Sequence, residues 1–167
     1  MEYFSWSEAD LNILTKLNLD EDVMRFFEST LDRVASKAWL DRQMKMFDVH
    51  GFCYFKTLEK GTGEFVGIIG ISLQDYPSDF NPSVDIGYRL NKKFWNMGLA
   101  TEGALAMLDF SKNKCKINMI SCVASKPNKG SIHIMEKVGF TFQYDFVHPN
   151  LARDSWLQPC VYYSKNL

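Results

Sequence analysis

Residues 84–102, VDIGYRLNKKFWNMGLATE, constrain the fold of this chain more than any other segment. A strand-like run leads through a short polar link into a turn at Asn96-Met97-Gly98-Leu99-Ala100, which opens a helix. A second strand-like run, over 117–124, follows this helix. A strand, a helix and a strand in this order predict a right-handed crossover that joins two parallel strands. The segment therefore predicts an α/β fold.

The turn before this helix is a candidate anion site. The first N–H groups of a helix have no partners within it, and they lie at the positive end of the helix dipole. Gly98 and Ala100 are small enough for a phosphate to approach the backbone closely. A glycine before a helix is also a common turn requirement, so the turn alone does not establish phosphate binding.

Hydrophobic periodicity and turn residues divide the rest of the chain into further helices and strands. The predicted helices cover 7–19, 21–27, 30–47, 99–112 and 128–137, and the predicted strands cover 52–58, 64–73, 84–90, 117–124, 140–147 and 160–165. The turn Lys60-Gly61-Thr62-Gly63 joins the first two strands in a hairpin, so we expect three consecutive antiparallel strands. Because the 167 residues contain no repeat or linker, we expect one domain over residues 1–167.

Composition argues against several classes of protein. The 19 basic and 20 acidic side chains give a net charge of −1, which argues against a surface for nucleic acids or anionic membranes. No two of the four cysteines have C-x-x-C spacing and the three histidines are widely spread, so we expect reduced cysteines and no metal site. The start of the chain shows no signal-peptide pattern, and no apolar run approaches the length of a membrane span. These features predict a cytoplasmic globular protein.

Four stretches in a specific order resemble the GNAT superfamily of N-acetyltransferases, and within it the RimJ/RimL type, which acetylates ribosomal-protein N-termini. They are DEDVMRFF from Asp20, GEFVGIIGI from Gly63, DIGYRLNKKFWNMGLATEGA from Asp85 and NKGSIHIMEKVGF from Asn128. The resemblance implies an α/β fold with a twisted, mixed and mostly antiparallel sheet of about six to seven strands, flanked by about four helices and splayed at the cofactor site. It also implies acetyl-CoA as the donor substrate.

The phosphate loop of this family has the form Q/R-x-x-G-x-G/A. It falls on Trp95, Asn96, Met97, Gly98, Leu99 and Ala100. Trp95 stands in place of Gln or Arg, as is usual for this branch, and a packing role for it competes with a ligand role. Asn96 stands where this branch often has glycine, and asparagine accepts turn conformations well. Thr101 can add a hydroxyl donor near the helix start.

The resemblance places the pantetheine arm of the cofactor along the strand before this loop. Main-chain groups are expected to bind the arm as an added strand would. The residues expected to supply them are Tyr88, Arg89 and Leu90. Asn128 matches an asparagine that contacts the pantetheine amides and Ser131 a serine near the thioester sulfur, although the spacing N-x-x-S also fits a helix cap. Gly87 marks either a bulge or a close approach of another group.

The simplest mechanism is direct attack of a neutral amine on the thioester while both substrates are bound. An α-amino group, with a pKa of about 7.7–8.0, is partly neutral at pH 7, whereas a lysine-type amine near 10.4 needs a base. Asp85 is the candidate base, with a structural charge as the competing interpretation and Glu102 as an alternative base. Ser131 is the candidate acid for the departing thiolate, with Tyr144 as a distant second. No cysteine has a signature that indicates a covalent acetyl-enzyme.

The acceptor site is the least defined part of the sequence. We expect it between the N-terminal helices, the loop 75–82 and the loop 148–159. Asp75, Asp79 and Asp85 would form an acidic mouth for a cationic acceptor, but carboxylates on a loop are usually only solvated. The resemblance suggests a peptide N-terminal α-amine, and the same branch also acetylates amino acids, polyamines and aminoglycosides.

Two further alternatives stay open at the level of the sequence. A non-catalytic module that binds acyl-CoA and regulates a partner would carry the same cofactor pattern, whereas a dinucleotide fold is disfavoured because no G-x-G-x-x-G follows the first strand. The family usually opens with a strand, for which this chain offers only Glu2-Tyr3-Phe4-Ser5, so we expect that strand to be short or absent. An exposed sheet edge often recruits a partner strand, so both a monomer and a homodimer are consistent with the sequence.

Overall fold

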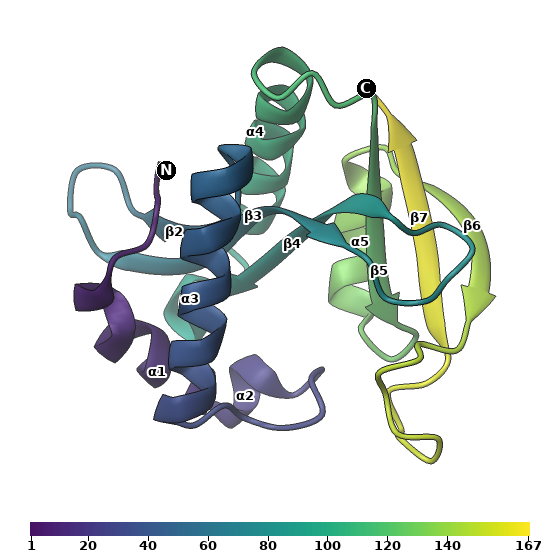
Figure 1. Cartoon of the computed structure of the whole chain (residues 1–167), viewed down its shortest axis with the longest axis horizontal. Helices are drawn as coiled ribbons and strands as arrows, with labels where there is room; N and C mark the ends of the chain where they lie inside the picture. Colours follow the sequence, from purple (N-terminus) through teal and green to yellow (C-terminus); the bar gives the residue numbers. More distant parts are fainter.

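Seven strands form one sheet in the order β1-β2-β3-β4-β5-β7-β6 in the computed structural model, which describes all 167 residues (Figure 1). The strands are β1 (Glu2–Phe4), β2 (Tyr54–Leu58), β3 (Phe65–Gln74), β4 (Ser83–Leu90), β5 (Met119–Ser125), β6 (Thr141–Phe146) and β7 (Cys160–Asn166). The α-helices are α1 (Leu11–Leu19), α2 (Glu21–Met24), α3 (Arg33–His50), α4 (Leu99–Asn113) and α5 (Lys129–Lys137). Two short 3-10 helices, η1 (Glu8–Asp10) and η2 (Lys92–Phe94), precede α1 and α4. The predicted α/β class and mostly antiparallel sheet are confirmed.

The sheet consists of two antiparallel parts joined by one short parallel contact. β1 to β4 pair antiparallel in sequence order, which confirms the three consecutive strands expected from the sequence. β5, β7 and β6 pair antiparallel in the other part. β4 and β5 run parallel, as the crossover predicts, but they share only the pair Asp85↔Ser121. The two parts diverge beyond Asp85, so alternate main-chain groups in the rest of β4 have no neighbouring strand on that side.

Helices cover both faces of the first part of the sheet (Figure 1). Strand pairing places Tyr54 and Gly87 on one face, and Tyr54 stacks on Trp39 of α3, so α1–α3 cover that face. α4 lies on the other face, where a Cβ added to Gly103 would come within 2.4 Å of Ile69 Cδ1. Glycine at this position therefore allows α4 to approach β3 closely. None of the helices combines the length and the apolar composition that crossing a membrane requires.

Local capping explains where α3 differs from its predicted bounds. α3 begins at Arg33 rather than at residue 30, because Asp32 accepts a hydrogen bond from the Ala35 N–H at 2.8 Å and caps the helix. It continues to His50 and ends at Gly51, whose φ of 73° favours glycine. α2 stops at Met24, short of the predicted residue 27.

The first strand is present and short, as the sequence suggests. β1 contributes three residues, which pair antiparallel with β2. Ser7 then begins η1 through a capping box with Asp10, whose carboxylate accepts from both the N–H and the hydroxyl of Ser7. β1 is thus a paired strand of only three residues at the edge of the sheet.

Candidate active site

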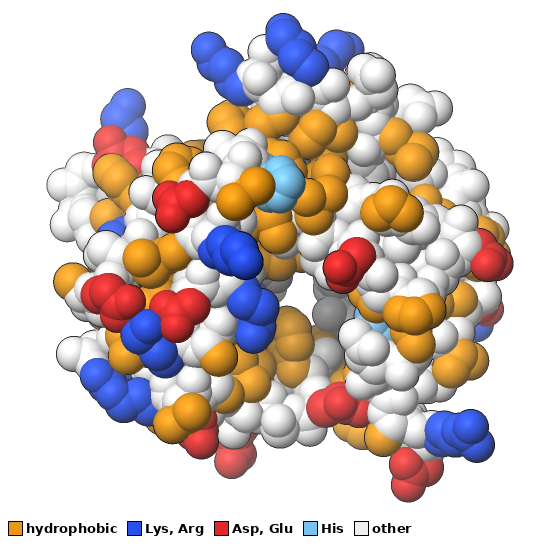
Figure 2. Space-filling view, in the orientation of Figure 1, with side chains coloured by type: hydrophobic (Ala, Val, Ile, Leu, Met, Phe, Trp, Pro, Cys, Tyr) orange, Lys and Arg blue, Asp and Glu red, His pale blue; other side chains and the backbone are white.

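A cleft of about 1070 Å³ opens where β4 and β5 diverge. Figure 2 shows it as the hollow at the centre of the molecule, between the part that carries α1–α3 and the part formed by β5–β7. Its walls come from α2, β4, the loop that opens α4, and the adjoining ends of β5 and α5. A concave site with a mostly apolar wall and a few converging polar groups is the usual form of a ligand site.

The turn before α4 has the geometry of an anion-binding loop. Gly98 is the N-cap of α4 with a φ of 77°, and Asn96 has a φ of 61°. Both angles lie in the left-handed region, which glycine and asparagine adopt most readily. A Cβ built on Gly98 would meet no atom within 4 Å, so the space beside the helix start is open. The first N–H groups of α4 are therefore accessible to an anion.

The predicted loop residues divide between the cleft and the exterior. Six of them line the cleft: Trp95, Asn96, Gly98, Leu99, Ala100 and Thr101. Met97 does not line it, and 59% of its surface is exposed. Trp95 lines the cleft and also packs, because its Nε1 donates to the Leu90 carbonyl at 2.8 Å and ties the loop to the end of β4. The guanidinium of Arg25 lies over the Trp95 ring at 5.1 Å.

β4 contains no bulge. Its register with β3 is continuous over the whole strand, so the bulge considered at Gly87 is wrong and the close approach is correct. A Cβ on Gly87 would lie 2.8 Å from Cε1 of Tyr54, because the tyrosine ring covers the strand there. The opening beside β4 arises from the divergence of β5 after Asp85. The predicted strand residues that line it are Tyr88, Arg89 and Leu90.

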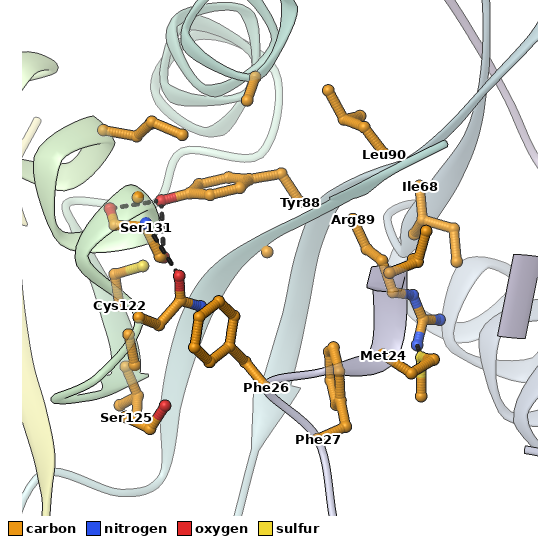
Figure 3. Close-up of a pocket in the computed structure, with 18 of the residues that line it drawn as sticks. Met24, Phe26, Phe27, Ile68, Tyr88, Arg89, Leu90, Cys122, Ser125 and Ser131 are labelled. Carbon is orange, nitrogen blue, oxygen red and sulfur yellow. Dashed lines mark hydrogen bonds between the residues drawn. The ribbon is translucent and has the colours of Figure 1, made fainter. Parts of the chain in front are cut away.

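The start of α5 meets β4 through Tyr88 (Figure 3). Asn128 caps α5, since its Oδ1 accepts from the Ser131 N–H at 3.1 Å. The Tyr88 hydroxyl lies 3.0 Å from Ser131 Oγ and 3.0 Å from the Ser131 carbonyl oxygen. The cap and a ligand role are compatible, because the cap uses Oδ1 of Asn128 and leaves its amide NH2 as a donor. Burial raises the pKa of Tyr88, so its hydroxyl stays protonated.

Asp85 forms a hydrogen-bonded cluster with two residues that are distant from it in the sequence. Its Oδ1 accepts from the Tyr54 hydroxyl at 2.5 Å and from Gln74 Nε2 at 3.0 Å. Burial raises the pKa of Asp85 to about 6, against the lowering effect of these two hydrogen bonds. Burial and the Asp85 charge also raise the pKa of Tyr54, which therefore remains a donor. The cluster lines the cleft, and a carboxyl with this pKa can exchange a proton near neutral pH.

Several polar residues considered for the site lie elsewhere. Asp75 and Asp79 are exposed and do not line the cleft, so the acidic mouth expected from them and Asp85 does not form. Glu102 is exposed on α4 and does not line the cleft either, which removes it as an alternative base. Tyr144 lines a separate, smaller pocket, so it is not placed to protonate a thiolate in the cleft.

The segments expected around the acceptor do border the cleft. Residues 22–29 form one wall, and Tyr76 and His148 contribute from the loops 75–82 and 148–159. The rings of Tyr76 and His148 lie 4.3 Å apart, which joins the two loops. Burial lowers the pKa of His148, with an opposing effect of Glu28, so the imidazole is neutral at pH 7.

The residues that sequence reasoning missed are those whose position depends on strand register. Tyr54 of β2 and Gln74 of β3 reach Asp85 only because their strands lie side by side with β4. The side chain of Arg89 was also missed, since only its main chain was expected to act. One signal existed for Gln74: it is a polar residue at the end of an apolar strand, on the face that also carries Asp85.

Comparison with known proteins agrees with this geometry. Residues 4–141 match the family model described as an acetyltransferase (GNAT) domain. The uncharacterized protein YkkB of Bacillus subtilis (strain 168) is 27% identical over 146 residues, which cover 87% of this chain and 80% of that protein.

Two solved structures share the fold at low identity. Spermidine N-acetyltransferase from Vibrio cholerae, in complex with CoA and spermine, superposes with a TM-score of 0.79 at 15% identity. The match covers 99% of this chain and 94% of the V. cholerae chain. Ribosomal-protein-alanine N-acetyltransferase from Brucella melitensis has a TM-score of 0.75 at 16% identity and covers 100% of both chains. The two act on different acceptors, so the shared fold does not single out the ribosomal-protein branch.

Proposed function

We propose that this chain, which belongs to the GNAT acetyltransferase family, transfers the acetyl group of acetyl-CoA to a primary amine. The amine attacks the thioester directly while both substrates are bound. The observation that carries the proposal is the divergence of β4 from β5 directly beside the open start of α4. Unpaired main-chain groups of β4 suit an extended arm that contains amides, and the helix start suits its phosphates. Residues 88–90, the loop 95–101, Asn128 and Ser131 hold the cofactor in this proposal.

Asp85 is the general base in this proposal. An amine must be neutral to attack, and a carboxylate can take its proton directly or through a water molecule. With a pKa of about 6, Asp85 is mostly ionised at pH 7.5. Tyr54 and Gln74 both bind Oδ1, so they orient the carboxylate and leave Oδ2 to accept the proton.

Charge that develops during the reaction is stabilised by groups of β4 and α5. A main-chain N–H of the unpaired part of β4 can donate to the thioester oxygen as it becomes negative. The hydroxyls of Tyr88 and Ser131 lie 3.0 Å apart where β4 meets the start of α5, and the Tyr88 hydroxyl donates to the Ser131 carbonyl. Either hydroxyl can turn its proton toward the departing thiolate. Ser131 was expected to act in this way from the resemblance, and the hydroxyl of Tyr88 is added by the geometry.

A direct transfer fits the cleft better than a covalent acetyl-enzyme. Cys122 is the buried thiol of β5 on the cleft wall, and its Sγ donates to the Ile86 carbonyl at 3.4 Å. Burial raises its pKa well above the ordinary value, and the charge of Asp85 adds to this effect. A thiol held in its neutral form is a poor nucleophile.

We expect the purified protein to release CoA from acetyl-CoA only when an amine acceptor is present. The measurement is thiol release against a panel of peptides with free N-termini, amino acids, polyamines and aminoglycosides, with N-terminally blocked peptides as the control. Acetyl-CoA alone should raise the melting temperature, because a ligand that binds only the folded state stabilises it. Binding without release for every acceptor would overturn the enzyme proposal and favour a non-catalytic acyl-CoA-binding module.

Tyr88→Phe is expected to lower kcat about tenfold at pH 7, because the thiolate loses a hydrogen-bond donor. Ser131→Ala should behave in the same way. The matched control is Tyr163→Phe, which removes a hydroxyl that donates to Glu136 at 3.0 Å outside the cleft. Equal losses in Tyr88→Phe and Tyr163→Phe would rule out a role in thiolate departure.

A further inference from the structure

Arg89 of β4 carries a positive charge at the cleft without a counter-ion. Figure 3 shows its side chain on the opposite side of the β4 ribbon from Tyr88, beside Met24 and Phe27. The guanidinium lies 5.1 Å from the centre of the Phe27 ring and 5.6 Å from that of Trp39. Its one hydrogen bond runs from Nη1 to the sulfur of Met24 at 3.0 Å, and its buried Nε has no partner.

The carboxylates on the neighbouring wall do not neutralise this charge. None of the protein's ion pairs includes Arg89. Asp22 pairs with Lys92, and Glu28 accepts from the Ala152 N–H at 2.6 Å. Burial lowers the pKa of Arg89 to about 10, so it remains charged at neutral pH. A buried charge without a partner is costly to a fold, and a bound anion would offset that cost.

Arg89 lies on the acceptor side of the cleft. Arg89 pairs with Ile68 in the register of β3 and β4, so the Arg89 side chain lies on the face of the sheet covered by α2 and α3. The helix α4 and the proposed phosphate loop before it lie on the other face. Asp85 is four residues earlier on the same face as Arg89, so the two α-carbons are about 13 Å apart. Between them, the Tyr54 ring lies against Gly87.

We propose that the amine acceptor carries a carboxylate, which Arg89 binds as a bidentate ion pair while the amine faces Asp85. This inference rests on the proposed function, in which an amine is the nucleophile. A guanidinium offers two parallel N–H donors that match a carboxylate. The rings of Phe27 and Trp39 hold the guanidinium and limit its contact with water, which strengthens the pair. Polyamines, whose cationic chains would face Arg89, are poor acceptors at this site.

The test compares acceptors that differ only in the carboxylate. Free amino acids are measured against the corresponding amino-acid amides, and peptides beginning with Glu or Asp against those beginning with Gln or Asn. The first pair tests an α-carboxylate and the second a side-chain carboxylate. For one of these two comparisons, we expect kcat/KM to be roughly 10- to 100-fold higher for the acceptor with the carboxylate. This ratio corresponds to the free energy that a charge-assisted hydrogen bond contributes. Spermidine should be the weaker substrate.

Three variants identify the source of this preference. Arg89→Met should bring the ratio close to one, and Arg89→Lys should give an intermediate ratio because it keeps the charge but loses the fork. The matched control is Arg25→Met, which removes an exposed guanidinium at the same cleft and should keep the wild-type ratio. The melting temperature of Arg89→Met should equal or exceed that of the wild type, since replacing a buried unpaired charge by an apolar side chain relieves desolvation.

The outcomes separate this inference from the proposed function. Turnover of neutral amides or polyamines at least as fast as of carboxylates would leave the enzyme proposal intact and overturn the carboxylate site. Equal loss in Arg89→Met for all acceptors, with a lower melting temperature, would also overturn it, because it would show a structural role. If no acceptor is turned over, N-acetyl amino acids and their amides are compared as ligands of the CoA-bound protein. Binding of the acids that depends on Arg89 would then support the carboxylate site in a protein that does not catalyse acetyl transfer. Equal binding of acids and amides would refute the carboxylate site.

Discussion

Asp85→Asn is expected to lower kcat at least 100-fold at pH 7 and, at the same time, to stabilise the fold. The expected loss of activity follows from removing the proposed general base, which takes the proton of the amine. The gain in stability follows from the raised pKa, since the native state at neutral pH contains a carboxylate removed from water. Asparagine keeps an oxygen that can accept from Tyr54 and Gln74 without the charge.

The sign and size of the stability effect come from the pKa of Asp85. The folded pKa of about 6 exceeds the ordinary value of 3.8, so this group's contribution to stability is full below pH 3.8 and is lost as the pH rises through 6. The shift corresponds to about 1–2 kcal/mol once the partial exposure of the carboxylate to the cleft is allowed for. Thermal melts of wild type and Asp85→Asn at pH 4.5 and 7.5 measure it, and the advantage of the variant should appear mainly at pH 7.5.

Asp10→Asn is the matched control. Burial alone would raise the pKa of Asp10, but hydrogen bonds from Lys56 and Ser7 lower it, and Lys56 Nζ lies 2.7 Å from its carboxylate. The variant should therefore destabilise the fold, opposite in sign to Asp85→Asn, without a specific loss of kcat. If Asp85→Asn destabilises the protein, or if its kcat stays within about threefold of wild type, Asp85 is a structural charge and not the base.

The dependence of kcat on pH gives a second measure of the same group. The wild-type activity should rise as the pH increases through about 6, because the carboxylate must be ionised to accept a proton. Tyr54→Phe removes a hydrogen bond that lowers the pKa of Asp85, so this rise should move to higher pH. An unchanged pH profile of kcat in Tyr54→Phe would show that the group whose ionisation controls kcat is not Asp85.

Gly98→Trp is expected to weaken acetyl-CoA binding at least 100-fold, which corresponds to about 2.7 kcal/mol. The space beside Gly98 is open in the structure, and an indole there would fill the place proposed for the cofactor phosphates at the start of α4. Calorimetric titration of acetyl-CoA measures the affinity, and the cofactor-induced rise in melting temperature should disappear.

The control for Gly98→Trp must carry the same backbone strain. Gly63→Trp meets this need, because Gly63 has a φ of 72° and open space around it, and it lies in the turn between β2 and β3 away from the cleft. Both variants should lose similar stability, and only Gly98→Trp should lose the cofactor. Affinity within about threefold of wild type in Gly98→Trp (~0.65 kcal/mol) would show that this turn does not hold the phosphates.

Features that depend on neighbours along the chain could be predicted from the sequence. The strands followed from alternation and β-branched content, and the turn at Asn96 and Gly98 followed from residues that accept a positive φ, which both adopt. The crossover followed from the order of elements and appears as the parallel contact of β4 with β5. Helix ends were less predictable: α3 begins at Arg33 and not at residue 30, since the carboxylate of Asp32 caps it.

The chemistry of the cleft depends instead on residues that only folding brings together. Tyr54 and Gln74 lie 31 and 11 residues from Asp85, and the register of three strands makes them its partners and sets its pKa. The isolation of Arg89 has the same origin, because no local pattern shows which face a strand residue takes or which carboxylates are engaged elsewhere. Hydrogen bonds and desolvation act over a few ångströms in space, whereas sequence patterns record only distance along the chain. The phosphate-loop pattern was therefore visible in the sequence, whereas the raised pKa of Asp85 and the unpaired charge of Arg89 emerged only from the packed strands.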